Sequence, residues 1–251
     1  MSTYSQKSYA YKQFGRWSGS FAQDFAIVET ILRHRRQFFE EMRTGIGLPE
    51  KTRAMLVSSS AFLAAYGAVL GSTHSLWQAL SSAVKLPILF LVTLLICIPA
   101  LYIFSVLFGS NQRLQQSIAL VLSAITVTAV LLLSLAPITL FFVLTTNGYQ
   151  FFKLLNVLFF AIAGIIGMLF LSRGMRVFSA SDQENGGRMR SVVVYLWIFL
   201  YAFVGSQMAW TLRPFVGYPG AQFELIRELG GNFYGDILVS IGELLGFVAV
   251  M

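Results

Sequence analysis

Long apolar stretches, separated by short polar links, occupy most of the chain. Five of these stretches approach or exceed the roughly 20 residues that a helix needs to cross the hydrocarbon core of a bilayer. They lie at 54–71, 86–108, 116–144, 151–171 and 191–212. We therefore predict an all-α fold, a polytopic membrane bundle with five transmembrane helices.

Composition supports this prediction and narrows the chemistry. Of 251 residues, 56% are hydrophobic and 12% are charged, about half the charged fraction of a soluble domain. The one cysteine, Cys97, lies in an apolar run, so no disulfide can form within the chain. His34 and His74 both lie outside the middle of a span and have no neighbouring ligand residue. We expect no metal and no cofactor held by histidines.

The distribution of lysine and arginine predicts the orientation. With five spans, 14 of the 18 basic residues fall on the side of the N-terminus. The other side holds Lys85, Lys153, Arg213 and Arg227. The positive-inside rule then places the N-terminus in the cytoplasm and the C-terminus outside or in a lumen.

The two ends of the chain differ from the predicted bundle. The final apolar run, 237–251, is short and contains Glu243, so we expect an interfacial helix there, although a crossing stays open. The segment 75–84 is expected to be a short amphipathic link ahead of the second span. The predicted division is a cytoplasmic segment at 1–53, a bundle at 54–212 and an outer tail at 213–251.

A basic cluster precedes the first span. The stretch ILRHRRQFF at 31–39 contains Arg33, Arg35 and Arg36, and Ser20 begins a sequence typical of a helix capping box. An apolar stripe follows at helical spacing, made of Phe21, Phe25, Val28, Leu32, Phe39 and Met42. We predict an amphipathic helix lying on anionic lipid, with the arginines in lipid contact and fixing the topology. A protein partner is the alternative, and no nucleic-acid module accompanies the cluster.

Prolines and polar side chains interrupt the spans. A small transporter or channel for a neutral or apolar solute is the alternative function, and its path would contain Pro99, Pro137, Asn156 and Gln207. No Asp, Glu, Lys or Arg lies in the middle of a span, which argues against ion-coupled transport. Polar groups in such spans more often form hydrogen bonds between helices.

Small residues and one arginine suggest contacts. Gly67 and Gly71 form a GxxxG pattern that favours close packing, either within the bundle or between two copies of the chain. Gly164 and Gly205 belong to similar small-residue patterns in the fourth and fifth spans. After the fifth span, Arg213 lies in WTLRPFVGYPG, a sequence typical of an interfacial anchor. The alternative is that Arg213 binds an anionic lipid headgroup or a partner carboxylate.

No catalytic motif is present. The chain has no phosphate-binding glycine loop, HExxH, GxSxG or plausible carboxylate pair, so we expect no enzyme and no catalytic residue. The leading hypothesis is a non-enzymatic membrane scaffold or assembly subunit that binds other membrane proteins and anionic lipids. A bacterial plasma membrane and an internal photosynthetic or endomembrane both fit the sequence.

One region resembles a known family. It runs from Leu86-Pro87 through Pro99 and Tyr102 to Gly109-Ser110 and the start of the third stretch. This order resembles the proline-containing second span and glycine–serine turn of the Yip family of Rab-interacting membrane proteins, including its bacterial members. The resemblance covers about 38–212 and implies a cytoplasmic N-terminal segment, five spans and a C-terminus outside or in a lumen. It further implies vesicle traffic and membrane shaping, or a membrane organiser in bacteria.

Overall fold

The computed structural model describes residues 21–72, 75–107, 113–145, 148–179, 187–216 and 231–245. These residues are almost all helical and contain no strand. The helices are α2 (Phe21–Arg33), α3 (Arg35–Thr44), α4 (Leu48–Gly71), α5 (Leu76–Leu107), α6 (Leu114–Thr145), α7 (Tyr149–Ser179), α8 (Gly187–Thr211) and α9 (Phe233–Leu244).

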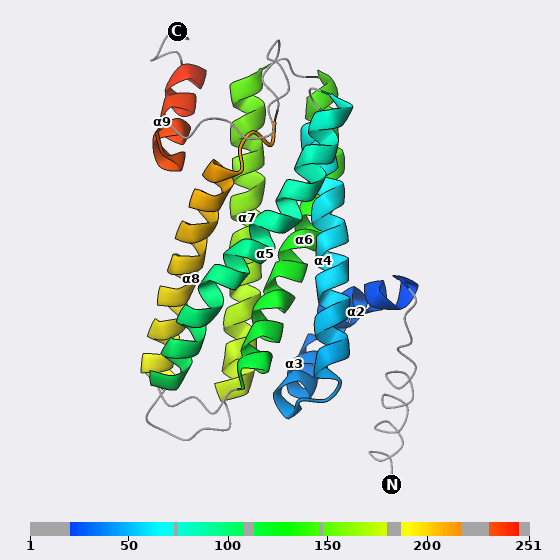
Figure 1. The fold of residues 1–251 in the computed structure, drawn as a ribbon, viewed down its shortest axis with the longest axis vertical. Coiled ribbons are helices and arrows are strands. Elements are labelled where there is room, and N and C mark those ends of the chain that lie inside the picture. Colours follow the sequence, from blue (N-terminus) through cyan, green and yellow to red (C-terminus); the bar gives the residue numbers. More distant parts are fainter. Residues whose placement is uncertain are drawn as a thin grey trace.

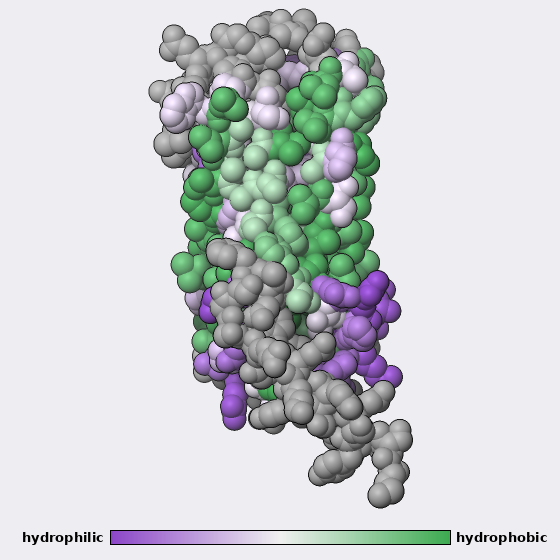
Figure 2. Space-filling view, turned by 90° about the vertical axis from the view of Figure 1, so that its right-hand side faces the viewer, coloured by the Kyte–Doolittle hydropathy of each residue, from purple (hydrophilic) through white to green (hydrophobic). Residues whose placement is uncertain are grey.

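Four helices in this part of the chain are long and apolar enough to cross a membrane. They contain the segments Leu48–Gly71, Leu76–Ala100, Leu114–Thr145 and Tyr149–Val177. Helix α8, with 25 residues, runs alongside them for much of the length of the bundle (Figure 1). Large apolar side chains such as Leu95 and Phe141 are exposed on the outer faces. Apolar colours dominate the side of the bundle in Figure 2, as lipid contact requires.

Helix α5 corrects one prediction. The segment 75–84 is not a separate amphipathic link, because α5 runs without interruption from Leu76 to Leu107 with Pro87 and Pro99 inside it. Two polar side chains of this segment, Gln78 and Ser82, are buried instead of lying at the surface. Helix α6 is likewise one helix, and Pro137 does not divide it.

The prediction of a single amphipathic helix before the first span is also wrong. It is two helices, α2 and α3, interrupted at His34, whose φ of −118° and ψ of 38° are not helical. The connection from α3 to α4 contains Gly45 and Gly47, at φ of 76° and 61°. Glycine adopts this left-handed conformation readily, so the chain can turn sharply from α3 into α4, and α2 packs against α4. The predicted capping box at Ser20 lies outside the described residues.

The diagonal path of α5 organises the bundle (Figure 1). The first half of α5 packs on α4 at Gly67 and Gly71, where an added Cβ would lie well under 3 Å from the backbone of Ser82 and of Gln78. The Gly67/Gly71 face is therefore covered by the same chain. Its predicted use between two copies is wrong for this reason.

The second half of α5 packs on α8 instead. The Nε1 atom of Trp197 donates to the carbonyl oxygen of Cys97 at 3.0 Å. The Oη atom of Tyr201 donates to the carbonyl oxygen of Phe90 at 3.3 Å. Along its length, α5 therefore leaves α4 and approaches α8. It packs on these two helices at different depths of the bundle.

Candidate functional site

Most of the basic residues that the structure describes gather at the end of the bundle that carries α2 and α3. This end also contains the beginnings of α4 and α6 and the end of α7 (Figure 1). The hydrophilic colours in Figure 2 concentrate there. Among the residues whose exposure the structure describes, the exposed arginines of this end are Arg33, Arg35, Arg36, Arg53, Arg113, Arg173 and Arg176.

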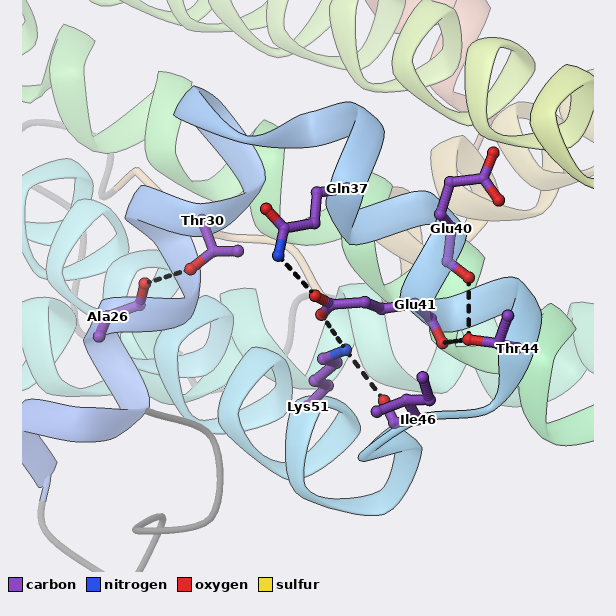
Figure 3. Close-up of polar contacts among 8 residues, drawn as sticks. All are labelled: Ala26, Thr30, Gln37, Glu40, Glu41, Thr44, Ile46 and Lys51. Atoms are coloured by element: carbon purple, nitrogen blue, oxygen red, sulfur yellow. Dashed lines mark hydrogen bonds and ion pairs between the residues drawn. The ribbon is translucent and has the colours of Figure 1, made fainter. Parts of the chain in front are cut away.

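A buried ion pair fixes α3 to α4 (Figure 3). The Nζ atom of Lys51 lies 2.7 Å from Oε2 of Glu41, and the two side chains are 2% and 15% exposed. Lys51 also donates to the carbonyl oxygen of Ile46 at 2.9 Å. The amide of Gln37 donates to the other carboxylate oxygen of Glu41 at 2.8 Å. A buried pair with such additional hydrogen bonds resists separation, because either charge left alone is poorly solvated.

A second set of contacts fixes α3 to α6 and α7. The Nε2 atom of Gln116, on α6, donates to the carbonyl oxygen of Arg43 at 2.8 Å. The ring of Phe39 lies 4.9 Å from that of Phe170 on α7, centroid to centroid. Phe38, Phe39 and Met42 are all buried. Helix α3 is thus an integral part of the bundle.

The predicted lipid-facing stripe is consequently divided. Phe39 and Met42 pack inside the protein, whereas Phe25 and Leu32 on α2 are 36% and 52% exposed. The residues of the predicted stripe therefore lie on two helices, α2 and α3, that pack against different neighbours. A continuous apolar face on the lipid does not exist over α2 and α3.

The predicted lipid-binding or partner-binding arginines point away from this packing. Arg33 forms an ion pair with Glu29 at 2.9 Å, and both side chains are more than 60% exposed. Arg35 and Arg36 are exposed at the start of α3. We call the surface formed by Arg33, Arg35 and Arg36 the basic edge. Its contact with lipid or a partner stays a prediction.

A cavity of about 540 Å³ lies among α5, α6, α7 and α8. Its walls include Phe90 from α5, Phe160 and Gly164 from α7, and Tyr201 and Gly205 from α8. Helices α7 and α8 make few contacts with each other. A Cβ added at Gly164 would meet nothing within 4 Å, and one at Gly205 would meet its nearest neighbour at 3.6 Å. These glycines therefore leave space, instead of bringing two helices together.

Charged residues line the cavity where it approaches α9. Lys153 of α7 pairs with Asp236 of α9 at 2.8 Å, with side chains 20% and 37% exposed. The guanidinium of Arg213 lies over the Trp210 ring, 3.4 Å from its centroid. All four residues belong to the cavity wall. The predicted anchor at Arg213 is thus close to an internal space as well as to the end of α8.

The turn at 213–216 is fastened to α5 by residues that the sequence analysis missed. Gln78 and Lys85 donate to the carbonyl oxygen of Pro214 at 2.8 and 3.2 Å. Ser82 donates to the carbonyl oxygen of Phe215 at 2.7 Å. Spacings of four and three residues place these three side chains on one face of a helix. That spacing was the signal available in the sequence.

The four predicted path residues do not share a cavity. Asn156 belongs to the cavity wall, but Pro99, Pro137 and Gln207 do not. Pro99 and Pro137 are exposed on the outer faces of their helices, and Gln207 is partly exposed. The structure therefore gives no common path to these residues.

Asn156 instead forms a hydrogen-bond network between helices. Its Oδ1 atom accepts from Oη of Tyr66 at 2.8 Å, and its Nδ2 atom donates to the carbonyl oxygen of Phe152. The hydroxyls of Tyr66 and Thr139 are 3.3 Å apart. The network joins α4, α6 and α7, the role expected for most polar groups in an apolar bundle.

Comparison with known protein families identifies the family of this chain. The sequence profile of the Yip1 domain matches residues 30–207, from α2 into α8, including most of the cavity walls but neither the 213–216 turn nor α9. No curated protein and no solved structure matches the chain. The match covers more than half of the chain and agrees with the resemblance noted in its second span. Together with its apolar helices, it shows that the chain is a multi-pass integral membrane protein belonging to the Yip1 domain family.

Proposed function

We propose that this protein is a non-enzymatic membrane scaffold or assembly subunit that binds other membrane proteins through the basic edge. The observation that carries the proposal is the buried Lys51–Glu41 pair, which holds α3 on the bundle while Arg35 and Arg36 remain exposed. A surface held in place by the fold loses little freedom on binding, so it can bind a partner at a lower entropic penalty.

The proposed topology has five crossings, α4 to α8. Helix α8 has the length for a fifth crossing. Residues 1–53 would form the cytoplasmic segment, 54–212 the bundle and 213–251 the outer tail. The concentration of exposed arginines at the α2–α3 end supports a cytoplasmic N-terminus.

The chemistry of the basic edge favours an acidic partner surface. Arginine forms paired hydrogen bonds with carboxylates and phosphates. Anionic lipid headgroups would contribute about 1 kcal/mol per basic residue close to the membrane. Lipid attraction of this kind would bring partner and scaffold together at one membrane face.

The test is cross-linking from the basic edge in native membranes. A photoreactive residue replaces Arg36, and the products are identified by mass spectrometry. The matched control carries the same residue in place of Arg176, an exposed arginine on α7 at the same end of the bundle. We expect a stoichiometric membrane-protein partner from position 36 that disappears with Arg33→Glu and Arg35→Glu together. Recovery of lipid adducts alone, or the same products from both positions, would contradict the proposal.

The cavity favours a second candidate function, passage of a neutral or apolar solute. Of the four predicted path residues, only Asn156 lies in the cavity wall, so the support is the cavity itself. Purified protein in liposomes should then accelerate solute efflux, and filling the cavity at Gly164 should abolish that acceleration. Efflux equal to that of empty liposomes would remove this candidate.

A further inference from the structure

The cavity has the dimensions of a site for one lipid chain. Its wall on α8 extends from Trp197 to Trp210, which is about 20 Å along a helix that rises 1.5 Å per residue. The hydrocarbon core of a bilayer is about 30 Å thick, so one leaflet is about 15 Å deep. A volume of about 540 Å³ is also typical of sites that enclose a small molecule.

The cavity, like a lipid, has a charged end and a mainly apolar remainder. Lys153, Arg213 and Asp236 lie where the cavity meets α9 and the 213–216 turn. Away from these residues its walls are mainly apolar, with Phe160 and Ile198 among them. Two cations and one anion give this group a formal charge of +1, which complements the single negative charge of a phosphodiester.

Two polar groups in the wall are available to a ligand. The Oγ1 atom of Thr93 and the Nε1 atom of Trp210 are buried and have no hydrogen-bond partner among the described residues. Thr93 is 1% exposed. Leaving such a group unsatisfied in a buried position is unfavourable. The ester and phosphate oxygens of a glycerophospholipid are acceptors that could satisfy both donors.

We propose that the cavity among α5, α6, α7 and α8 binds one glycerophospholipid. One acyl chain lies along Gly164 and Gly205, and the phosphate lies beside Arg213 and Lys153. This inference is independent of the proposed partner binding, because the charged end of the cavity and the basic edge lie at opposite ends of the bundle and share no residue. It also explains why a Cβ added at Gly164 would meet nothing within 4 Å: the neighbour of this glycine is the lipid.

Native mass spectrometry of the full chain, delipidated and then supplied with phosphatidylglycerol, tests the proposal. Gly164→Phe places an aromatic ring in the proposed acyl position, starting from a Cβ that would meet nothing within 4 Å. Ile162→Phe is the matched control, because Ile162 is on the same helix, is exposed and does not belong to the cavity wall. We expect one lipid to remain bound to the unmodified chain and to Ile162→Phe. Retention by Gly164→Phe should fall by about tenfold or more.

A second lipid tests the headgroup part of the proposal. Diacylglycerol with the same acyl chains lacks the phosphate, so it should be retained about tenfold less than phosphatidylglycerol. Arg213→Gln should remove that preference while the protein still elutes as a folded species. Equal retention of the two lipids would overturn the headgroup assignment. Equal phosphatidylglycerol retention by Gly164→Phe and Ile162→Phe would show surface lipid only and overturn the site.

Discussion

Two glycines of α7 show how differently the α3 end and the middle of this bundle are built. At Gly174, an added Cβ would lie 2.6 Å from Cε1 of Phe39, because α3 packs tightly against this end. At Gly164, fewer than three turns earlier, the same Cβ would meet nothing within 4 Å. Both are glycines in one apolar helix, yet one accommodates a neighbouring side chain and the other borders a cavity. A small-residue pattern indicates room near the backbone, but what occupies that room depends on where neighbouring helices pass.

The polar contacts of the two ends differ in the same way. Near α3, Glu41 and Lys51 pair across ten residues of sequence, and both side chains are largely buried. Near the cavity, Lys153 and Asp236 pair across 83 residues of sequence and stay partly exposed. The first end is closed by its own side chains, and the second keeps its charges at the boundary of an open space.

Removing one charge of the buried pair should have the largest effect. Lys51→Ala leaves the Glu41 carboxylate without its cation, a change that destabilises by roughly 3–5 kcal/mol for buried pairs. The thermal midpoint in detergent should fall accordingly. The double variant Glu41→Leu with Lys51→Met removes both charges and should recover most of the loss. An equal loss in the double variant would show that packing, and not the unpaired charge, dominates at this end.

Substitution by alanine should distinguish a glycine packed against another helix from a glycine that borders the cavity. Gly67→Ala places a Cβ against the backbone of Ser82 and should destabilise the protein by about 1–3 kcal/mol, as overpacking does. Gly164→Ala should leave stability unchanged or raise it by up to about 1 kcal/mol, since alanine favours helix. Thermal unfolding of both variants in the same detergent makes the comparison. Similar losses at the two sites would contradict the described difference between them.

The hydrogen bonds between the spans should contribute less. Tyr66→Phe removes the hydroxyl that donates to Asn156, and such bonds inside membrane proteins are worth about 0.6 kcal/mol on average. Tyr195→Phe, at a tyrosine that is 66% exposed, is the control and should change stability less. A denaturant titration of each purified variant gives the two values. A larger effect at Tyr195 would mean that the network does not hold the helices together.

A substitution in the basic edge should barely change the stability of the protein. Arg33→Ala breaks an exposed pair with Glu29, and pairs of this kind contribute about 0.3–0.5 kcal/mol in a helix. The thermal midpoint should therefore change little, and the small change should vanish at high salt. A loss comparable to that of Lys51→Ala would show that Arg33 serves the fold, which would weaken its proposed role in binding.

Much of the fold followed from the sequence because the length of an apolar run is a local property. The stretches at 116–144 and 151–171 correspond to α6 and α7 within a few residues at most ends. The break at His34 was not predicted, because apolar residues at helical spacing continue past it. Gln78 was assigned to a surface link because its burial depends on Pro214, which is 136 residues away in the chain.

The candidate sites were harder to predict from the sequence, for a related reason. The exposed arginines were found because charge and position before a span are visible in the sequence. The cavity was not found, since it results from the diagonal path of α5 and the separation of α7 from α8. Its wall residues, such as Thr93 and Gly205, belong to runs that look like ordinary spans. Crossing directions of helices are set by the whole bundle.

The attachment of the 213–216 turn to α5 has a consequence for biosynthesis. Lys85 leaves the ribosome long before Pro214, which lies 129 residues further along the chain and accepts its hydrogen bond. Until α8 has been made, Lys85 and Gln78 lack this acceptor, and the amide of Gln78 must be solvated by water or headgroups, because unsatisfied donors are unfavourable in hydrocarbon. The first half of α5 can therefore settle fully only after the last long helix has been inserted. A nascent chain that stops before Pro214 would present these polar groups to the quality-control machinery of the membrane.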